Sequence, residues 1–113
     1  MAGEDANFTG VAGRYASALF DLAKDAGAID AVAADLAGLE QMMTQSADLR
    51  DLVKSPLFGR DDQTKAMGAI LERAGASDLT KKFIGLVATN RRLFALDGMI
   101  KTYQALVAQY RGE

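Results

Sequence analysis

The stretch from Val11 to Ala23, which reads VAGRYASALFDLA, is apolar around most of a helix circumference. At 3.6 residues per turn its apolar residues form two neighbouring stripes, which are Ala12, Ala16, Leu19 and Ala23, and Val11, Tyr15, Ala18 and Leu22. Only Arg14, Ser17, Asp21 and Lys24 form a polar strip. A helix on the surface of a small domain needs one apolar face. The second stripe must therefore be covered by more of the domain or by a partner.

Apolar residues keep a helical period along the rest of the chain, and no segment alternates as a strand does. We predict an all-α fold, a compact six-helix bundle in a single domain at residues 9–111, with residues 1–8 as a flexible tail. Short connections make sequential helices pack as neighbours. The expected helices are Thr9–Ala26, Ile29–Gln45, Ala47–Lys54, Asp61 or Asp62 to Gly75, Ser77 or Asp78 to Arg91 and Arg92, and Leu96–Tyr110.

The expected helix ends follow from local chemistry. Gly27 and Gly75 are suited to end helices, and Pro56 disfavours the helical conformation of the residue before it. Asp61 or Asp62 is expected to cap the fourth helix, and Ser77 or Asp78 the fifth.

Composition excludes several classes of function. The chain has 113 residues, a net charge of -2 and no cysteine, so it forms one domain without disulfides and has no basic field to attract nucleic acid. No apolar run approaches the ~18 residues of a membrane span, and Met1 to Asn7 does not resemble a secretory signal. We expect a soluble protein without direct membrane insertion, monomeric as an isolated domain.

Catalytic chemistry has little support. The chain contains neither histidine nor cysteine, which removes the usual general base, the thiolate nucleophile and the strong transition-metal ligands. The pairs Asp61–Asp62 and Asp48–Asp51 are better explained by the helix dipole, which stabilises acids in a first turn. No glycine-rich phosphate loop is present. We predict no catalytic residues, no cofactor, no metal and no enzymatic activity.

Three segments carry a resemblance to a known family. They read VAGRYASALFDLA, DLVKSPLFGRDDQTKAM and FIGLVATNRRLFALDGMIKTYQALV, and the likeness spans Val11 to Gln109 in order. Together they resemble the δ subunit of bacterial F-type ATP synthase, whose mitochondrial counterpart is the oligomycin-sensitivity-conferring protein. The resemblance implies a six-helix N-terminal domain in the peripheral stalk that keeps the catalytic head from turning with the rotor, at the cytoplasmic face of the bacterial inner membrane.

The resemblance also implies the partners. Family members bind the N-terminal helix of an α subunit in a groove between the first and fifth helices, and they bind the b subunits through a C-terminal domain. That second domain is expected to begin where this sequence stops, so attachment to the b subunits cannot be carried over to residues present here.

The residues of the two helices support a groove of this kind. Tyr15, Ala18 and Leu22 lie on the second stripe of the first helix, and the fifth helix carries a line separate from its core stripe, made of Leu79, Leu86 and Asn90. Ala18 and Gly85 are small enough to let a third helix approach closely. The alternative is that the second stripe is simply core.

Two other classes of function stay open from the residues alone. A helical adaptor for an unrelated partner would use the same groove, whereas a lipid-surface or small-ligand binder needs a basic rim or an enclosed cavity.

The remaining candidate residues are interpreted as structural. Arg91 and Arg92 are read as a solvated helix end, Met42, Met43 and Met67 as core, and Tyr103 and Tyr110 as covering the bundle with their hydroxyl groups in water.

Overall fold

The computed structural model describes residues 10–112, and within this range it contains helices and turns but no strand. The elements are α2 (Gly10–Asp25), α3 (Ile29–Gln45), α4 (Ala47–Lys54), α5 (Arg60–Ala74), α6 (Asp78–Thr89), the 3-10 helix η1 (Leu93–Ala95) and α7 (Leu96–Tyr110). The predicted all-α bundle is confirmed, and η1 is an element that the sequence did not predict. The expected tail at residues 1–8 and the expected start at Thr9 lie outside the described residues.

Several helix ends fall where glycine, serine and proline predict them. Gly75 ends α5 in the left-handed conformation, with φ of 72°, and its N–H donates to the carbonyl oxygens of Leu71 and Glu72. Gly27 has φ of 66° after α2, and Pro56 follows the end of α4. Ser46 caps α4 because its side chain accepts a hydrogen bond from the N–H of Leu49.

The predicted cap of α5 is wrong, whereas Ser77 is the predicted N-cap residue of α6 but makes no capping bond within that helix. Helix α5 begins at Arg60 after Gly59, which has no side chain to cap it, and Asp61 and Asp62 lie inside its first turn. There the helix dipole stabilises them without a capping bond. Ser77 occupies the N-cap position of α6, but its hydroxyl donates to Asp35 of α3 instead of accepting from its own helix.

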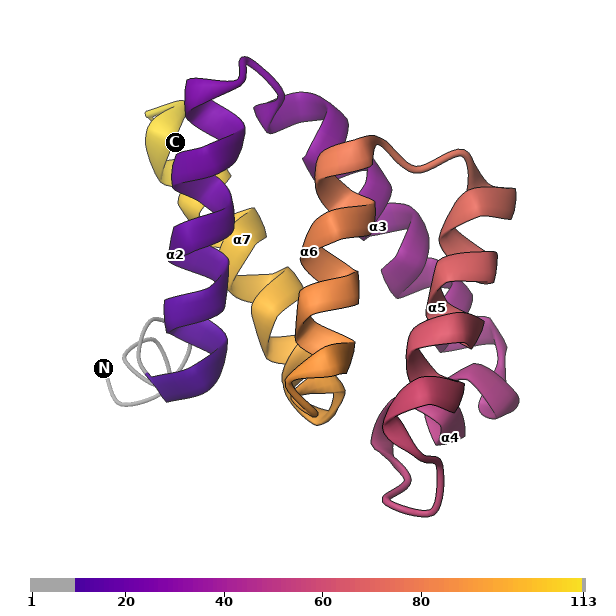
Figure 1. Ribbon diagram of the computed structural model, residues 1–113. Helices are drawn as coiled ribbons and strands as arrows, with labels where there is room; N and C mark the ends of the chain where they lie inside the picture. The colour runs from indigo at the N-terminus through magenta and orange to yellow at the C-terminus, as the bar shows by residue number, and fades with distance from the viewer. Residues whose placement is uncertain (1–9, 113) are drawn as a thin grey trace.

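Packing of the helices leaves α2 and α6 facing the same side of the molecule (Figure 1). Helix α2 packs mainly against α7, and α5 mainly against α6, while α3 contacts both α6 and α7. One continuous core lies between the helices. Five of the described α-helices contribute fully buried side chains to it, and α4 contributes Leu49 and Val53, which are almost fully buried. Met43 and Met67 are buried there, which confirms their interpretation as core residues.

Tyr103 corrects the interpretation of the two C-terminal tyrosines. Its side chain is fully buried, and its hydroxyl donates a hydrogen bond of 2.9 Å to the carbonyl oxygen of Ile29. Tyr110, about two helical turns later, is exposed and contacts Phe20 edge to face. Of the two tyrosines, Tyr110 alone lies on the outside of the bundle.

Candidate partner-binding site between α2 and α6

Helix α2 divides its two apolar stripes between the core and solvent. Ala16, Leu19 and Ala23 of the first stripe are buried in the core. On the second stripe Tyr15 is half-buried, Ala18 is exposed, and Leu22 is 55% exposed. The described part of this chain therefore leaves most of the second stripe uncovered.

Helix α6 has the same division. Phe83, Ile84 and Val87 are buried, whereas Leu86 is 54% exposed. Asn90, directly after the helix, is exposed. Leu79, which was also predicted for this surface, is half-buried and packs against the core.

Two contacts bring α2 and α6 together at one end of this surface. The side-chain amide of Asn90 donates a hydrogen bond of 2.9 Å to the hydroxyl oxygen of Tyr15. The ring of Tyr15 also meets Phe83 edge to face, with 6.3 Å between ring centroids. We call the surface formed by Tyr15, Ala18, Leu22, Leu86 and Asn90 the α2–α6 surface.

Sequence reasoning missed a polar network beside the end of α6. Arg91 adopts a left-handed conformation, with φ of 59°, and its guanidinium donates to the carbonyl oxygen of Phe58 at 3.0 Å and to Oε1 of Gln63 at 2.8 Å. Gln63 is buried and donates to the carbonyl oxygen of Leu52 at 2.9 Å. The interpretation of Arg91 as a solvated residue is therefore wrong, whereas Arg92 is exposed. The two bonds of Arg91 reach residues 28 and 33 positions away in the sequence, so the spacing of residues along the chain could not have predicted them.

The chemistry of the α2–α6 surface is that of contact rather than catalysis. The groups that form it are apolar apart from one phenol and one amide. A lowered pKa of Glu72 and a raised pKa of Lys81 arise from their mutual hydrogen bond, which joins α5 to α6 away from this surface. Within residues 10–112 no group of acidic side chains is arranged to hold a metal ion. No helix in that range is long and apolar enough to cross a membrane.

The fold and the site define a helical-bundle domain that presents apolar side chains from two neighbouring helices. The profile of the ATP synthase delta (OSCP) subunit family matches residues 11–113. The chain belongs to this family, whose delta subunits are non-catalytic parts of ATP synthase.

Curated relatives agree with the family assignment. The chain is 59% identical over 105 residues to the ATP synthase subunit delta of Parvibaculum lavamentivorans, covering 93% of this chain and 54% of that protein. It is 50% identical to that of Rhodopseudomonas palustris strain HaA2 and 53% identical to that of Rhodospirillum centenum, each over 113 residues, all of this chain and 61% of the relative. The chain thus spans about half to three-fifths of the length of these relatives.

Proposed function

We propose that this domain binds the N-terminal helix of an ATP synthase α subunit on the α2–α6 surface. In that role it is part of the peripheral stalk and helps to hold the catalytic head against the torque of the rotor. It works as a peripheral subunit at the cytoplasmic face of the bacterial inner membrane, and the b subunits attach through the remaining part of the subunit. Family membership supports the assembly, and the exposed apolar surface supports the kind of partner.

The observation that carries this proposal is the paired exposure of Leu22 and Leu86. Two large apolar side chains on neighbouring helices are each more than half exposed, beside the small residue Ala18. An amphipathic helix laid along such a surface buries them with its own anchors at i, i+3, i+4 and i+7. Tyr15 and Asn90, joined to each other, supply polar atoms at one end.

Titration with a peptide from the N-terminus of an α subunit, followed by calorimetry, tests the proposal. Because a carboxylate at position 18 or 86 stays in water until the partner docks, Ala18→Glu and Leu86→Glu are expected to weaken binding by about 2 to 4 kcal/mol, or roughly 30- to 1000-fold. The melting temperature is expected to change little.

Matched substitutions at exposed positions elsewhere supply the controls. Ala69→Glu on α5 and Leu57→Glu before it place the same charges on exposed residues outside the α2–α6 surface and are expected to leave the affinity unchanged. Leu36→Glu, in the core, is expected to unfold the domain. Unchanged affinity of Ala18→Glu and Leu86→Glu would contradict the proposed site. Preferential binding of an unrelated amphipathic helix would make the domain a different adaptor.

A further inference from the structure

Charged side chains along α2 border the α2–α6 surface in a fixed order. Arg14, Asp21 and Asp25 are exposed, and none has an ion-pair partner within residues 10–112. Their spacing of seven and four residues places them, with Ala18, on one stripe of the helix. At a rise of 1.5 Å per residue, the cation lies roughly 10 to 17 Å from the two anions.

Helix α6 extends the same asymmetry. It runs antiparallel to α2, so its first residue Asp78 lies toward the end of α2 that carries Asp25 (Figure 1). Asp78 is exposed. At the opposite end, beside Arg14 and Tyr15, α6 contributes the uncharged Asn90. Lys82 is exposed and lies four residues after Asp78 and eight before Asn90, so α6 also places one cation between these two residues.

We infer that the partner helix carries cationic side chains beside Asp21 and Asp25 and an anionic side chain beside Arg14, and that this order of charge sets the direction in which the helix lies. The inference rests on the proposed function of the α2–α6 surface. Apolar contact alone does not distinguish the two directions, because it is non-directional. Charge complementarity does distinguish them, because one direction opposes unlike charges and the other opposes like charges.

The expected effect is moderate and depends on salt. Each exposed ion pair contributes roughly a one-and-a-half- to fivefold factor in affinity, so the three pairs together are expected to contribute about 3- to 100-fold at low ionic strength. The Debye length falls from about 30 Å at 0.01 M salt to about 3 Å at 1 M, so high salt is expected to remove most of this factor. Affinity from the apolar contacts is expected to persist.

The probe for this inference is a synthetic amphipathic helical peptide with lysines in its N-terminal half, glutamates in its C-terminal half and a nitroxide label at its N-terminus. Bound to this domain, it is expected to broaden the amide resonances around Leu22 and Asp25 and to spare those around Val11. The triple variant Arg14→Glu, Asp21→Lys, Asp25→Lys is expected to reverse the peptide, so that broadening moves to the residues near Val11.

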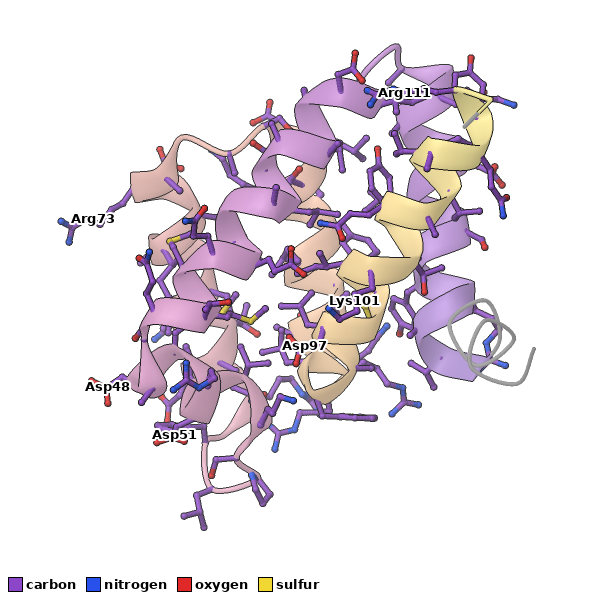
Figure 2. The ribbon with its side chains drawn as sticks, turned by 180° about the vertical axis from the view of Figure 1, so that it is seen from behind. Asp48, Asp51, Arg73, Asp97, Lys101 and Arg111 are labelled. Carbon is purple, nitrogen blue, oxygen red and sulfur yellow. The ribbon has the colours of Figure 1, made fainter. Side chains whose placement is uncertain are left out.

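A matched control carries the same three kinds of charge reversal away from the surface. Arg73→Glu, Asp48→Lys and Asp51→Lys change exposed side chains of α5 and α4, which project from the molecule far from α2 (Figure 2). This control is expected to leave both direction and affinity as they are.

Two failures are distinguishable. Saturable binding with equal broadening at both ends, or with the same direction in the wild type and the triple variant, would overturn the charge-order inference and leave the docking surface intact. Absence of binding by this peptide and by the α-subunit peptide alike would overturn the proposed function itself, and the inference with it.

Discussion

At the residue scale, the buried side chain of Tyr103 connects α7 to the start of α3. Its ring is fully buried in α7, where it meets Phe20 edge to face, and its hydroxyl donates to the carbonyl oxygen of Ile29 at the start of α3. Burial, with the nearby negative charge of Asp30, raises the pKa of Tyr103 to about 12. Helical spacing placed Tyr103 on the correct face of α7 but did not predict that α3 covers it, because that contact spans 74 residues.

The raised pKa of Tyr103 predicts a loss of stability in alkali. In the unfolded chain a tyrosine releases its proton near pH 10, whereas the folded domain retains that of Tyr103 until about pH 12. Between these values the unfolded state binds fewer protons, so the free energy of unfolding is expected to fall with rising pH, by at most about 1.4 kcal/mol per pH unit. Urea unfolding followed by circular dichroism at pH 8 and pH 11 measures this fall.

Tyr103→Phe is the control for that pH dependence. The variant lacks the hydrogen bond to Ile29, so it is expected to be less stable at pH 8 by about 1 kcal/mol. It also lacks the titrating hydroxyl, and its stability is expected to decline less between pH 8 and pH 11. An equal decline in both proteins would assign the alkaline effect to other groups.

Gly98 allows the close approach of α2 and α7. A Cβ atom added to Gly98 would lie 3.0 Å from the Cβ atom of Ala12, closer than side chains in well-packed cores tolerate without displacement. Gly98→Ala is therefore expected to destabilise the domain by about 1 to 2 kcal/mol. Gly68→Ala on α5, where an added Cβ meets nothing within 4 Å, is expected to stabilise it by about 0.5 to 1 kcal/mol. Thermal unfolding of the two variants measures both effects. If Gly98→Ala melts no lower than the wild type, the contact between α2 and α7 is not as close as proposed.

At the element scale, the N-terminus of α6 is held by a residue of another helix. Oδ2 of Asp35 accepts hydrogen bonds from the N–H of Ser77 at 2.9 Å, from the hydroxyl of Ser77 at 2.8 Å and from the hydroxyl of Thr80 at 2.7 Å. Thr80 is fully buried. Asp35 therefore fixes where α6 starts relative to α3, and α6 carries half of the α2–α6 surface.

Removal of this carboxylate is expected to destabilise α6. Asp35→Ala leaves the buried hydroxyl of Thr80 without its charged acceptor, so we expect a loss of about 2 to 3 kcal/mol in the free energy of unfolding. Asp35→Asn retains an oxygen acceptor and is expected to lose less. Asp51→Ala, at an exposed position of α4, serves as the control and is expected to change stability by less than about 0.5 kcal/mol. Equal urea midpoints for Asp35→Ala and Asp51→Ala would show that the three bonds contribute nothing net.

The elements also show which features local sequence determines. Gly27, Gly75 and Pro56 predicted helix ends correctly because each glycine acts through its own backbone and the proline through that of the adjacent Ser55. The period of α2 likewise separated the buried Leu19 from the exposed Leu22. The cap of α6 by Asp35 and the bond from Arg91 to Phe58 were not predicted, because each joins residues that only the tertiary fold brings together.

At the scale of the whole molecule, α3 connects two pairs of helices. Helix α2 packs mainly on α7 and α5 mainly on α6, while α3 contacts both α6 and α7 (Figure 1). The buried residues of all these helices form one cluster rather than two. Sequence periodicity predicted the six α-helices of residues 10–112 and their single core. It did not predict that α2 packs against α7, because no local signal specifies a contact between segments so far apart in the sequence.

One continuous core predicts that the two helix pairs unfold together, and the distribution of aromatic residues makes this testable. The chain has no tryptophan, and its three tyrosines lie in α2 and α7, so tyrosine fluorescence reports on that pair alone. Far-ultraviolet circular dichroism reports on every helix, including α5 and α6. In a two-state transition the urea midpoints from the two probes coincide and the calorimetric enthalpy equals the van't Hoff enthalpy. We expect coincident midpoints and equal enthalpies. Because the domain is expected to be monomeric, the midpoints should not depend on protein concentration. Loss of ellipticity before the change in tyrosine emission would show that α5 and α6 separate first, and that α3 does not couple the two pairs.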